Sequence, residues 1–240
     1  MNSIQKSTIH VLPQLETVFD QFNGLEAYCA ILNVDDWGYC KVIIDEFSMK
    51  TLKRHFSSLS NPLTRLIVYK ALWDMVLDIK LSAFEFIEFF IDAQNSPEIN
   101  LRVVDYMYNI ASQAMSYIPS EALKEKIAHE IFSIIVNKIE NSVSDEEQHL
   151  YINKSYQFLY AKSDIERCVN WLKNNKTDVK NWELEDDQRW SILKAYSNIN
   201  VNAEASILEE MDKNNSLYGY FAKLFCDAAY PEIEKKEAAW

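Results

Sequence analysis

Histidines are the residues of this chain that could hold a catalytic metal. A zinc site on one helix needs the pattern H-E-x-x-H, which places two imidazoles one turn apart with the glutamate as general base. His129-Glu130 begins this pattern, but Ser133 stands where the second histidine would have to be. The other histidines, which have no His or Cys three or four residues away, are His10, His55 and His149. We therefore predict no metal site and no cofactor in this chain, and exposed or capping roles for its histidines.

Nucleophiles and phosphate-binding loops also lack their sequence patterns. No serine lies in a G-x-S-x-G elbow, and the glycines that a phosphate loop would need are isolated, at Gly24, Gly38 and Gly219. The cysteines, which show no C-x-x-C spacing, are Cys29, Cys40, Cys168 and Cys226. Free, mostly buried thiols in a reducing compartment are predicted, with a Cys29–Cys40 bridge as the alternative. The chain on its own is expected to be catalytically silent.

Carboxylates and tryptophans are the remaining groups with chemical interest. Two acidic clusters, Asp145-Glu146-Glu147 and Glu185-Asp186-Asp187, precede apolar helical runs, where negative charge complements the positive end of the helix dipole. We predict capping for both clusters rather than catalysis, and the D-x-D-x-D-G pattern of a calcium loop is missing. Core packing is the favoured prediction for the aromatic residues. Trp37 and Trp182 fall in predicted connections, so for these two a contact with a partner is the alternative.

The composition is that of a folded, acidic protein. The 240 residues are 48% hydrophobic and 25% charged, with a formal net charge of −12. Such a charge repels a nucleic-acid backbone, and no basic stripe interrupts it, so nucleic acid is not an expected partner. No apolar stretch has the length of a membrane span and no signal peptide is visible at the start, so no membrane contact and a cytoplasmic location are predicted.

Helix starts recur from residue 47 onward. Asn61-Pro62 and Ser96-Pro97 offer an N-cap followed by proline at the first helical position. Capping boxes are predicted at the pairs Ser82/Glu85, Ser144/Glu147 and Ser163/Glu166. Together with the breaks between them, these signals predict about ten helices, of which 83–93 is apolar nearly all round and therefore central. Short connections favour an α–α superhelix of the HEAT or armadillo type, with an irregular bundle as the alternative.

Residues 1–46 differ in pattern from the rest. Apolar runs rich in β-branched and aromatic residues predict short strands near 7–12, 15–19, 27–32 and 39–44. Pro13 suits an edge or corner, and the cluster 33–38 predicts a turn. Four strands are too few for an independent sandwich. We expect this β segment to be the tail of a sheet, with exposed strand edges that allow weak self-association.

Several short stretches resemble one protein family when they are taken in order. They are Gly38-Tyr39-x-Lys41-Val42-x-x-Asp45, Leu63-x-Arg65 leading into Ala71-Leu72-Trp73-Asp74-Met75, Gln188-Arg189-Trp190-Ser191-Ile192-Leu193, and Lys236-Glu237-Ala238-Ala239-Trp240. Over residues 25–240 the chain is similar to the C-terminal helical domain of a bacterial branch of the aminopeptidase N family of zinc metallopeptidases. The family's zinc motif and its glycine-alanine-methionine-glutamate-asparagine motif are missing here.

The resemblance implies a division of the chain and a role for it. Residues 1–46 would be the end of the preceding β-sandwich domain. Residues 47–240 would be the helical-repeat C-terminal domain, expected to stop before the family's domain does. The parent enzyme would hold zinc and remove N-terminal residues from peptides. This portion would then contact the catalytic domain of the same polypeptide and wall and gate the substrate cavity. The alternative is a free-standing HEAT-like adaptor that binds a protein or helix on its concave face.

The resemblance also implies contact with the far end of a peptide substrate. Arginine suits that task because its fork pairs a carboxylate bidentately. The candidates, among which no family motif chooses, are Arg54, Arg65, Arg102, Arg167 and Arg189.

Overall fold

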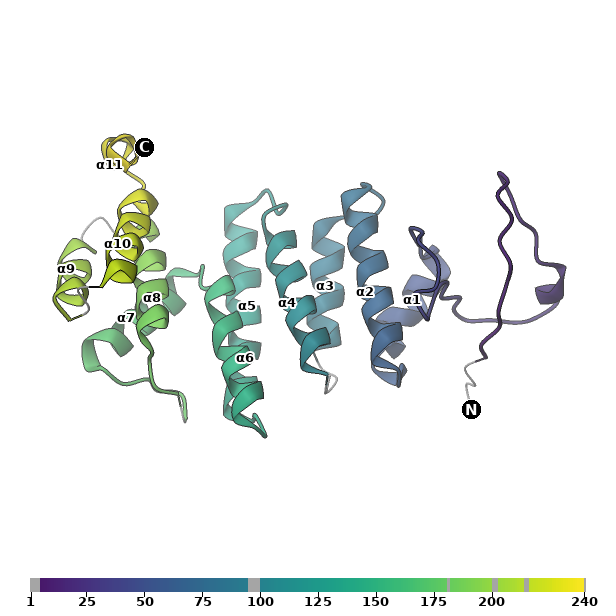
Figure 1. Ribbon diagram of the computed structural model, residues 1–240, viewed down its shortest axis with the longest axis horizontal. Coiled ribbons are helices and arrows are strands. Elements are labelled where there is room, and N and C mark those ends of the chain that lie inside the picture. The colour runs from purple at the N-terminus through teal and green to yellow at the C-terminus, as the bar shows by residue number, and fades with distance from the viewer. Residues whose placement is uncertain (1–4, 95–99, 181, 200–202, 214–215, 240) are drawn as a thin grey trace.

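The computed structural model describes residues 5–94, 100–180, 182–199, 203–213 and 216–239. These residues form eleven α-helices and no β-strand, which confirms a mainly α fold. The helices are α1 Glu46–His55, α2 Pro62–Leu77, α3 Ala83–Ala93, α4 Leu101–Met115, α5 Glu121–Glu140, α6 Asp145–Ser155, α7 Lys162–Asn174, α8 Asp186–Ile199, α9 Glu204–Lys213, α10 Leu217–Ala229 and α11 Ile233–Ala239. They follow one another along the long axis, from α1 at one end to α9, α10 and α11 at the other (Figure 1).

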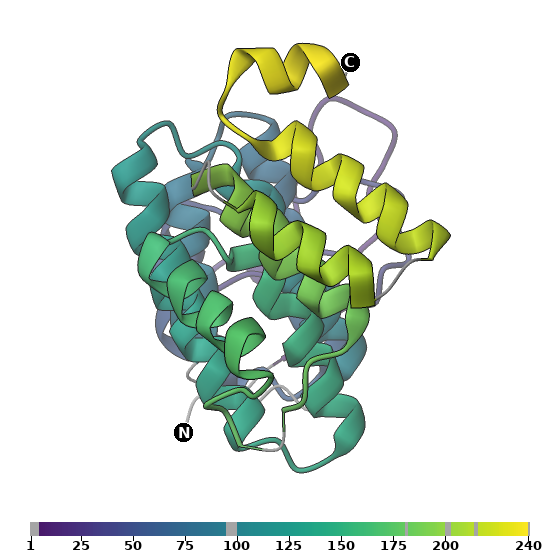
Figure 2. The same ribbon diagram turned by 90° about the vertical axis from the view of Figure 1, so that its left-hand side faces the viewer.

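The helices form two layers. In one layer α2 contacts α4 and α4 contacts α6, while in the other α1 contacts α3 and α5 contacts α7. Helices that follow each other in sequence also pack together across the layers, in the pairs α3–α4, α5–α6 and α7–α8. Figure 2 views this row from its C-terminal end, with α9, α10 and α11 towards the viewer. This arrangement is a row of paired helices, and its assignment to an α–α superhelix of the HEAT or armadillo type stays a prediction.

Most of the predicted helix caps are present. The Asn61 side chain accepts from the N–H of Leu63 at 2.9 Å, with Pro62 at the first helical position. Ser82 and Glu85 make the complete reciprocal capping box at the start of α3. Ser144 accepts from the N–H of Glu147 at 3.2 Å, but the Glu147 carboxylate accepts from the N–H of Val143 at 3.0 Å, so only half of that predicted box forms. These starts could be predicted because a cap depends on residues three positions apart.

The predicted cap at Ser163 is wrong. Helix α7 begins at Lys162 after Ala161, so Ser163 lies inside its first turn. The N–H of Lys162 donates to the Glu125 carboxylate of α5 at 3.2 Å. A tertiary contact therefore takes the place of the local cap. The other predicted start, Ser96-Pro97, lies outside the described residues.

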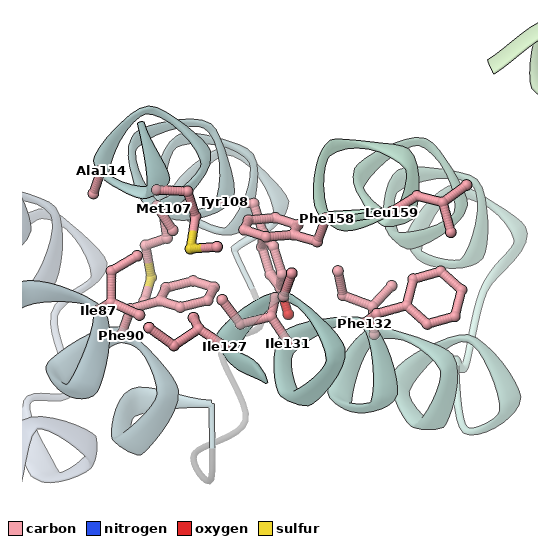
Figure 3. Packing of buried hydrophobic residues seen from close by; sticks show 14 of the residues in the cluster. Ile87, Phe90, Met107, Tyr108, Ala114, Ile127, Ile131, Phe132, Phe158 and Leu159 are labelled. Atoms are coloured by element: carbon pink, nitrogen blue, oxygen red, sulfur yellow. The ribbon is translucent and has the colours of Figure 1, made fainter. Parts of the chain in front are cut away.

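The core runs the length of the row. One connected group of buried apolar side chains extends from Val42 to Tyr230. Helix α3 is central, as predicted: Phe86, Ile87, Phe89 and Phe90 are buried, whereas Glu85, Glu88 and Asp92 face the solvent. Phe90 meets side chains from α4 and from the 3-10 turn Tyr156–Phe158 (Figure 3).

The predicted β segment is wrong. Residues 5–45 contain turns and one 3-10 turn, Asp20–Phe22, and their backbone hydrogen bonds to one another span three residues or fewer. A strand forms when a neighbouring strand pairs with its N–H and C=O groups, and the four apolar runs do not pair with each other here. Many of their side chains are exposed, with Leu15 and Tyr39 fully so.

Residues 5–45 nevertheless have two ordered local features. The predicted turn at 33–38 forms, because the Asn33 side chain bonds both the N–H and the C=O of Gly38, at 2.9 and 2.8 Å. Residues 28–45 are also attached to the helices. The N–H of Ala30 donates to Ser48 Oγ at 2.9 Å, and Val42 and Ile44 are buried. The boundary near residue 46, where α1 begins, remains a prediction about domains.

The end of α2 leads to a first test. Ile79 has φ 59° and is 93% exposed, while the N–H of Lys80 reaches back to the C=O of Met75 at 2.8 Å. This is a helix end that favours glycine, because a β-branched residue in the left-handed region is strained. We expect Ile79→Gly to stabilise the protein by about 1 kcal/mol and raise Tm by about 2–4 °C. Calorimetry checks this, with Ile79→Ala as control. Equal gains in the two variants would mean that exposure, not backbone strain, is relieved.

Candidate functional site

A polar stripe on α7 borders an open hollow of the surface. Ser163, Arg167, Asn170 and Asn174 follow steps of four, three and four residues, which places them on one face of the helix. The opposite face of α7 is buried by apolar side chains, among them Ile165. The hollow has a volume of about 670 Å³, and its other wall is the chain that follows α7, through Lys176, Thr177 and Asp178.

Arg167 is held in place at the middle of this stripe. Its Nε lies 2.9 Å from one oxygen of Asp178, and a terminal nitrogen lies 2.9 Å from the other. Its guanidinium also lies 5.4 Å from the ring centre of Trp171. The hydrogen bonds to the Asp178 carboxylate raise the pKa of Arg167. Arg167 therefore joins the two walls of the hollow.

Backbone geometry fixes the second wall. Asn175 follows α7 with φ 50°, and the N–H of Lys176 bonds the C=O of Trp171 at 3.1 Å. Asparagine tolerates this left-handed helix end better than most residues do. The buried hydroxyl of Thr177 then donates to the carbonyl of Trp182 at 2.6 Å, and the carbonyl of Val179 lies 3.0 Å from the same oxygen. These bonds make the wall a defined surface.

The two tryptophans for which a contact role is the alternative behave differently. Trp37 is 90% exposed, as that role requires. Trp182 is only 3% exposed, and its indole N–H donates to Gln188 Oε1 at 3.1 Å. Trp182 therefore packs in the core and the contact alternative is wrong for it, because the connection that carries it folds back onto Trp171.

The five candidate arginines lie on five different helices. Arg54 on α1 and Arg102 on α4 are exposed, and within the described part of the chain neither guanidinium has a hydrogen-bond or ion-pair partner. Arg65 on α2 is half-buried and donates to the carbonyl of Leu59. The remaining two are Arg167, already described, and Arg189 on α8. The structure does not bring the five together.

Arg65 borders a second, much smaller cleft. It has a volume of about 20 Å³ and is lined also by Gln94, Tyr108 and Lys138. The Tyr108 hydroxyl donates to Gln94 Oε1 at 3.0 Å. The Lys138 ammonium lies 5.5 Å from the ring centre of Tyr151, and burial lowers the pKa of Lys138. The volume is of the size that holds water rather than a peptide.

Arg189 is buried and fully engaged. Its Nε and one terminal nitrogen donate to the two oxygens of Glu210 on α9, at 2.6 and 2.8 Å. Its other terminal nitrogen donates to Asn175 Oδ1 at 2.9 Å. Glu210 raises the pKa of Arg189 by accepting these bonds. Arg189 thus connects α8 and α9 to the start of the wall of the hollow.

The contacts of His129 and of the buried cysteines are those of side chains that stabilise the fold. His129 Nδ1 lies 2.9 Å from the buried Asp164 carboxylate, whose pKa burial raises despite that contact. All four cysteines are free thiols, as predicted, although only Cys168 and Cys226 are buried. Burial raises the pKa of Cys226 to about 12, and that of Cys168 further, which keeps both thiols protonated and poorly nucleophilic.

No metal centre is assembled by the side chains that the structure describes. Within residues 5–94, 100–180, 182–199, 203–213 and 216–239, no three His, Cys, Asp or Glu side chains converge closely enough to hold an ion. A zinc ion of the kind that the family resemblance implies does not fit these residues. Across the same described residues, no helix is both long and apolar enough to cross a membrane.

The hollow along α7 is a feature that the sequence analysis missed. The only signal in the sequence is the 4-3-4 spacing of Ser163, Arg167, Asn170 and Asn174. A polar stripe at that spacing is the ordinary solvent face of an amphipathic helix. What makes it a wall is the folding back of 174–178, which depends on Asn175, Thr177 and Asp178.

Comparisons with known proteins give one consistent relationship. The family model described as "ERAP1-like C-terminal domain" matches residues 30–240. Aminopeptidase N of Streptomyces lividans is 17% identical over 210 residues, which cover 88% of this chain and 24% of that protein. The chain therefore spans about a quarter of the length of this relative.

Proposed function

This chain belongs to the family of ERAP1-like C-terminal domains, and from that premise we propose that it is the non-catalytic C-terminal portion of a zinc aminopeptidase. The parent enzyme would remove N-terminal residues from peptides, and this portion would wall and gate the cavity that the peptide enters. The match over residues 30–240 carries the proposal.

The arrangement of the helices supports this role. A row of paired helices offers a long side to a neighbouring domain and to an elongated ligand. The first described residues, 5–45, carry many exposed apolar side chains, as a segment that packs against another domain would. The proposed partners are accordingly the catalytic domain of the same polypeptide, which would hold the zinc, and the peptide substrate. A cytoplasmic location and weak self-association through residues 1–46 stay predictions.

The arginines differ in how well they suit a substrate carboxylate. Arg54 and Arg102 come first, because their donors are exposed and have no partner within the described residues. The donors of Arg167 and Arg189 point at Asp178 and Glu210, so these two arginines fit positioning roles better. All five stay candidates for kinetic tests in the parent enzyme.

The isolated chain is expected to be catalytically silent. The described residues assemble no metal donor set, and the buried thiols stay protonated. Without an electrophile or a nucleophile, a binding surface lowers the barrier to amide hydrolysis very little. We expect less than stoichiometric zinc in elemental analysis and no cleavage of aminoacyl anilides above background. Stoichiometric zinc together with turnover that a chelator abolishes would contradict this.

The parent reading frame separates this proposal from the adaptor alternative. An upstream H-E-x-x-H motif in the same frame supports the aminopeptidase portion, because such a motif supplies two zinc ligands and the general base. An upstream stop codon or an unrelated domain supports a free-standing adaptor. Sequencing the transcript that encodes residues 1–240 decides between the two.

A further inference from the structure

We propose that the hollow along α7 binds an extended peptide segment through its main chain, with Asn170 and Asn174 as the principal contacts. The choice of a peptide as the ligand rests on the proposed function, because peptides are the substrates of the proposed parent enzyme. The hollow of about 670 Å³ lies within the size range of small-ligand sites.

The spacing of the two asparagines matches an extended chain. Residues 170 and 174 are four apart on a helix, which separates them by about 6 Å along its axis. An extended peptide repeats every two residues, over about 6.6 Å. Asn170 and Asn174 can therefore meet successive peptide units on the same edge of one chain. The whole stripe from Ser163 to Asn174 spans about 17 Å, the length of about five extended residues.

The chemistry of the stripe also matches. A side-chain amide has N–H donors and a C=O acceptor, so it can pair with both the C=O and the N–H of a peptide backbone. Asn170 and Asn174 are exposed, and neither amide has a hydrogen-bond partner in the described part of the chain. The same hollow is lined by Trp171, which is 3% exposed and whose indole N–H meets no acceptor among the described residues.

The charges favour a peptide over an anionic ligand. The guanidinium of Arg167 is neutralised by Asp178, and Glu166 adds a negative charge to the lining. Lys176 is the one lining cation, within the described residues, without an ion-pair partner. The lining therefore holds two cations, Arg167 and Lys176, and two carboxylates, Glu166 and Asp178, so a phosphate would meet no net positive charge there. Main-chain hydrogen bonds need no such charge.

Binding of a defined peptide tests the inference directly. The probe is acetyl-(Ser-Val)₄-amide with a fluorescein label, followed by fluorescence anisotropy with the 240-residue chain. We expect the double variant Asn170→Ala/Asn174→Ala to weaken binding at least about tenfold, since each amide loses a pair of hydrogen bonds. The matched control is Asn153→Ala/Asn198→Ala, which removes two exposed amides from α6 and α8. A second probe carries N-methyl groups on alternate residues and should bind as weakly as the unmodified probe binds the double variant.

The outcomes are separable. Equal affinity of the double variant and the control, with unchanged far-UV circular dichroism, would overturn the hollow as the site. Undiminished binding of the N-methylated probe would overturn main-chain recognition. No binding of the unmodified probe up to about 1 mM would overturn both. None of these results affects the reading-frame test, so a failure of this inference can be distinguished from a failure of the proposed function.

Discussion

Arg189→Met is expected to destabilise the protein by about 3–5 kcal/mol, because it leaves the Glu210 carboxylate buried without a partner. Both side chains are nearly inaccessible, with 7% of Arg189 and 5% of Glu210 exposed. Two short bonds, 2.6 and 2.8 Å, join both carboxylate oxygens of Glu210 to Arg189. A buried carboxylate without its cation carries most of its desolvation cost.

The double variant Arg189→Met/Glu210→Leu gives the control for this prediction. Removing both charges removes the desolvation cost, so most of the lost stability should return. Urea denaturation of the single and double variants measures both effects. The interpretation fails if Arg189→Met costs less than about 1 kcal/mol, or if the double variant is less stable than the single one.

Arg189 also ties stability to the hollow along α7. Its third hydrogen bond holds Asn175, the residue whose left-handed conformation turns the chain into the second wall. Loss of that bond frees the residues between Asn174 and Asp178 from α8. Arg189 thus acts on the hollow as a positioning residue, one step removed from any bound peptide. If Arg189→Met still folds but binds the peptide more weakly, Arg189 positions the wall of the hollow.

Features that depend on residues close together in the sequence could be predicted. The caps at Asn61, Ser82 and Ser144 depend on backbone and side chains within three residues, and all three are present. The central position of helix 83–93 could be predicted because apolar side chains cover nearly all of its faces. The cap expected at Ser163 failed because Glu125, 37 residues away, bonds Lys162 instead.

The β segment failed for a related reason. Apolar alternation shows that a stretch is able to form a strand, but a strand needs a partner to bond with. Among residues 5–45 the turn at 33–38 was predictable, since Asn33 and Gly38 bond each other directly. The hollow along α7 was not, because its second wall depends on a fold-back of the chain. Polar residues at helical spacing look alike whether they face a wall or bulk water.

The aromatic contacts of Phe90 join segments that are distant in the sequence. Its ring lies 4.9 Å from that of Tyr108 on α4, edge to face, and 6.4 Å from that of Phe158 after α6. Figure 3 shows the three rings with Ile127 and Ile131 of α5 around them. Phe90 is completely buried, so helices α3 to α6 share one packed site.

Phe90→Ala should accordingly cost about 3–5 kcal/mol, the range for a buried phenylalanine truncated in a core that relaxes only partly. Phe84→Ala on the same helix is the matched control, since Phe84 is 39% exposed and should cost much less. Urea denaturation measures both. Because each pair in a row of helices is stabilised by its neighbours, we also expect amide hydrogen exchange in Phe90→Ala to quicken on both sides of the site, in α2 and in α6. Faster exchange confined to α3, or equal costs for the two variants, would show that the rings of Phe90, Tyr108 and Phe158 do not couple the helices.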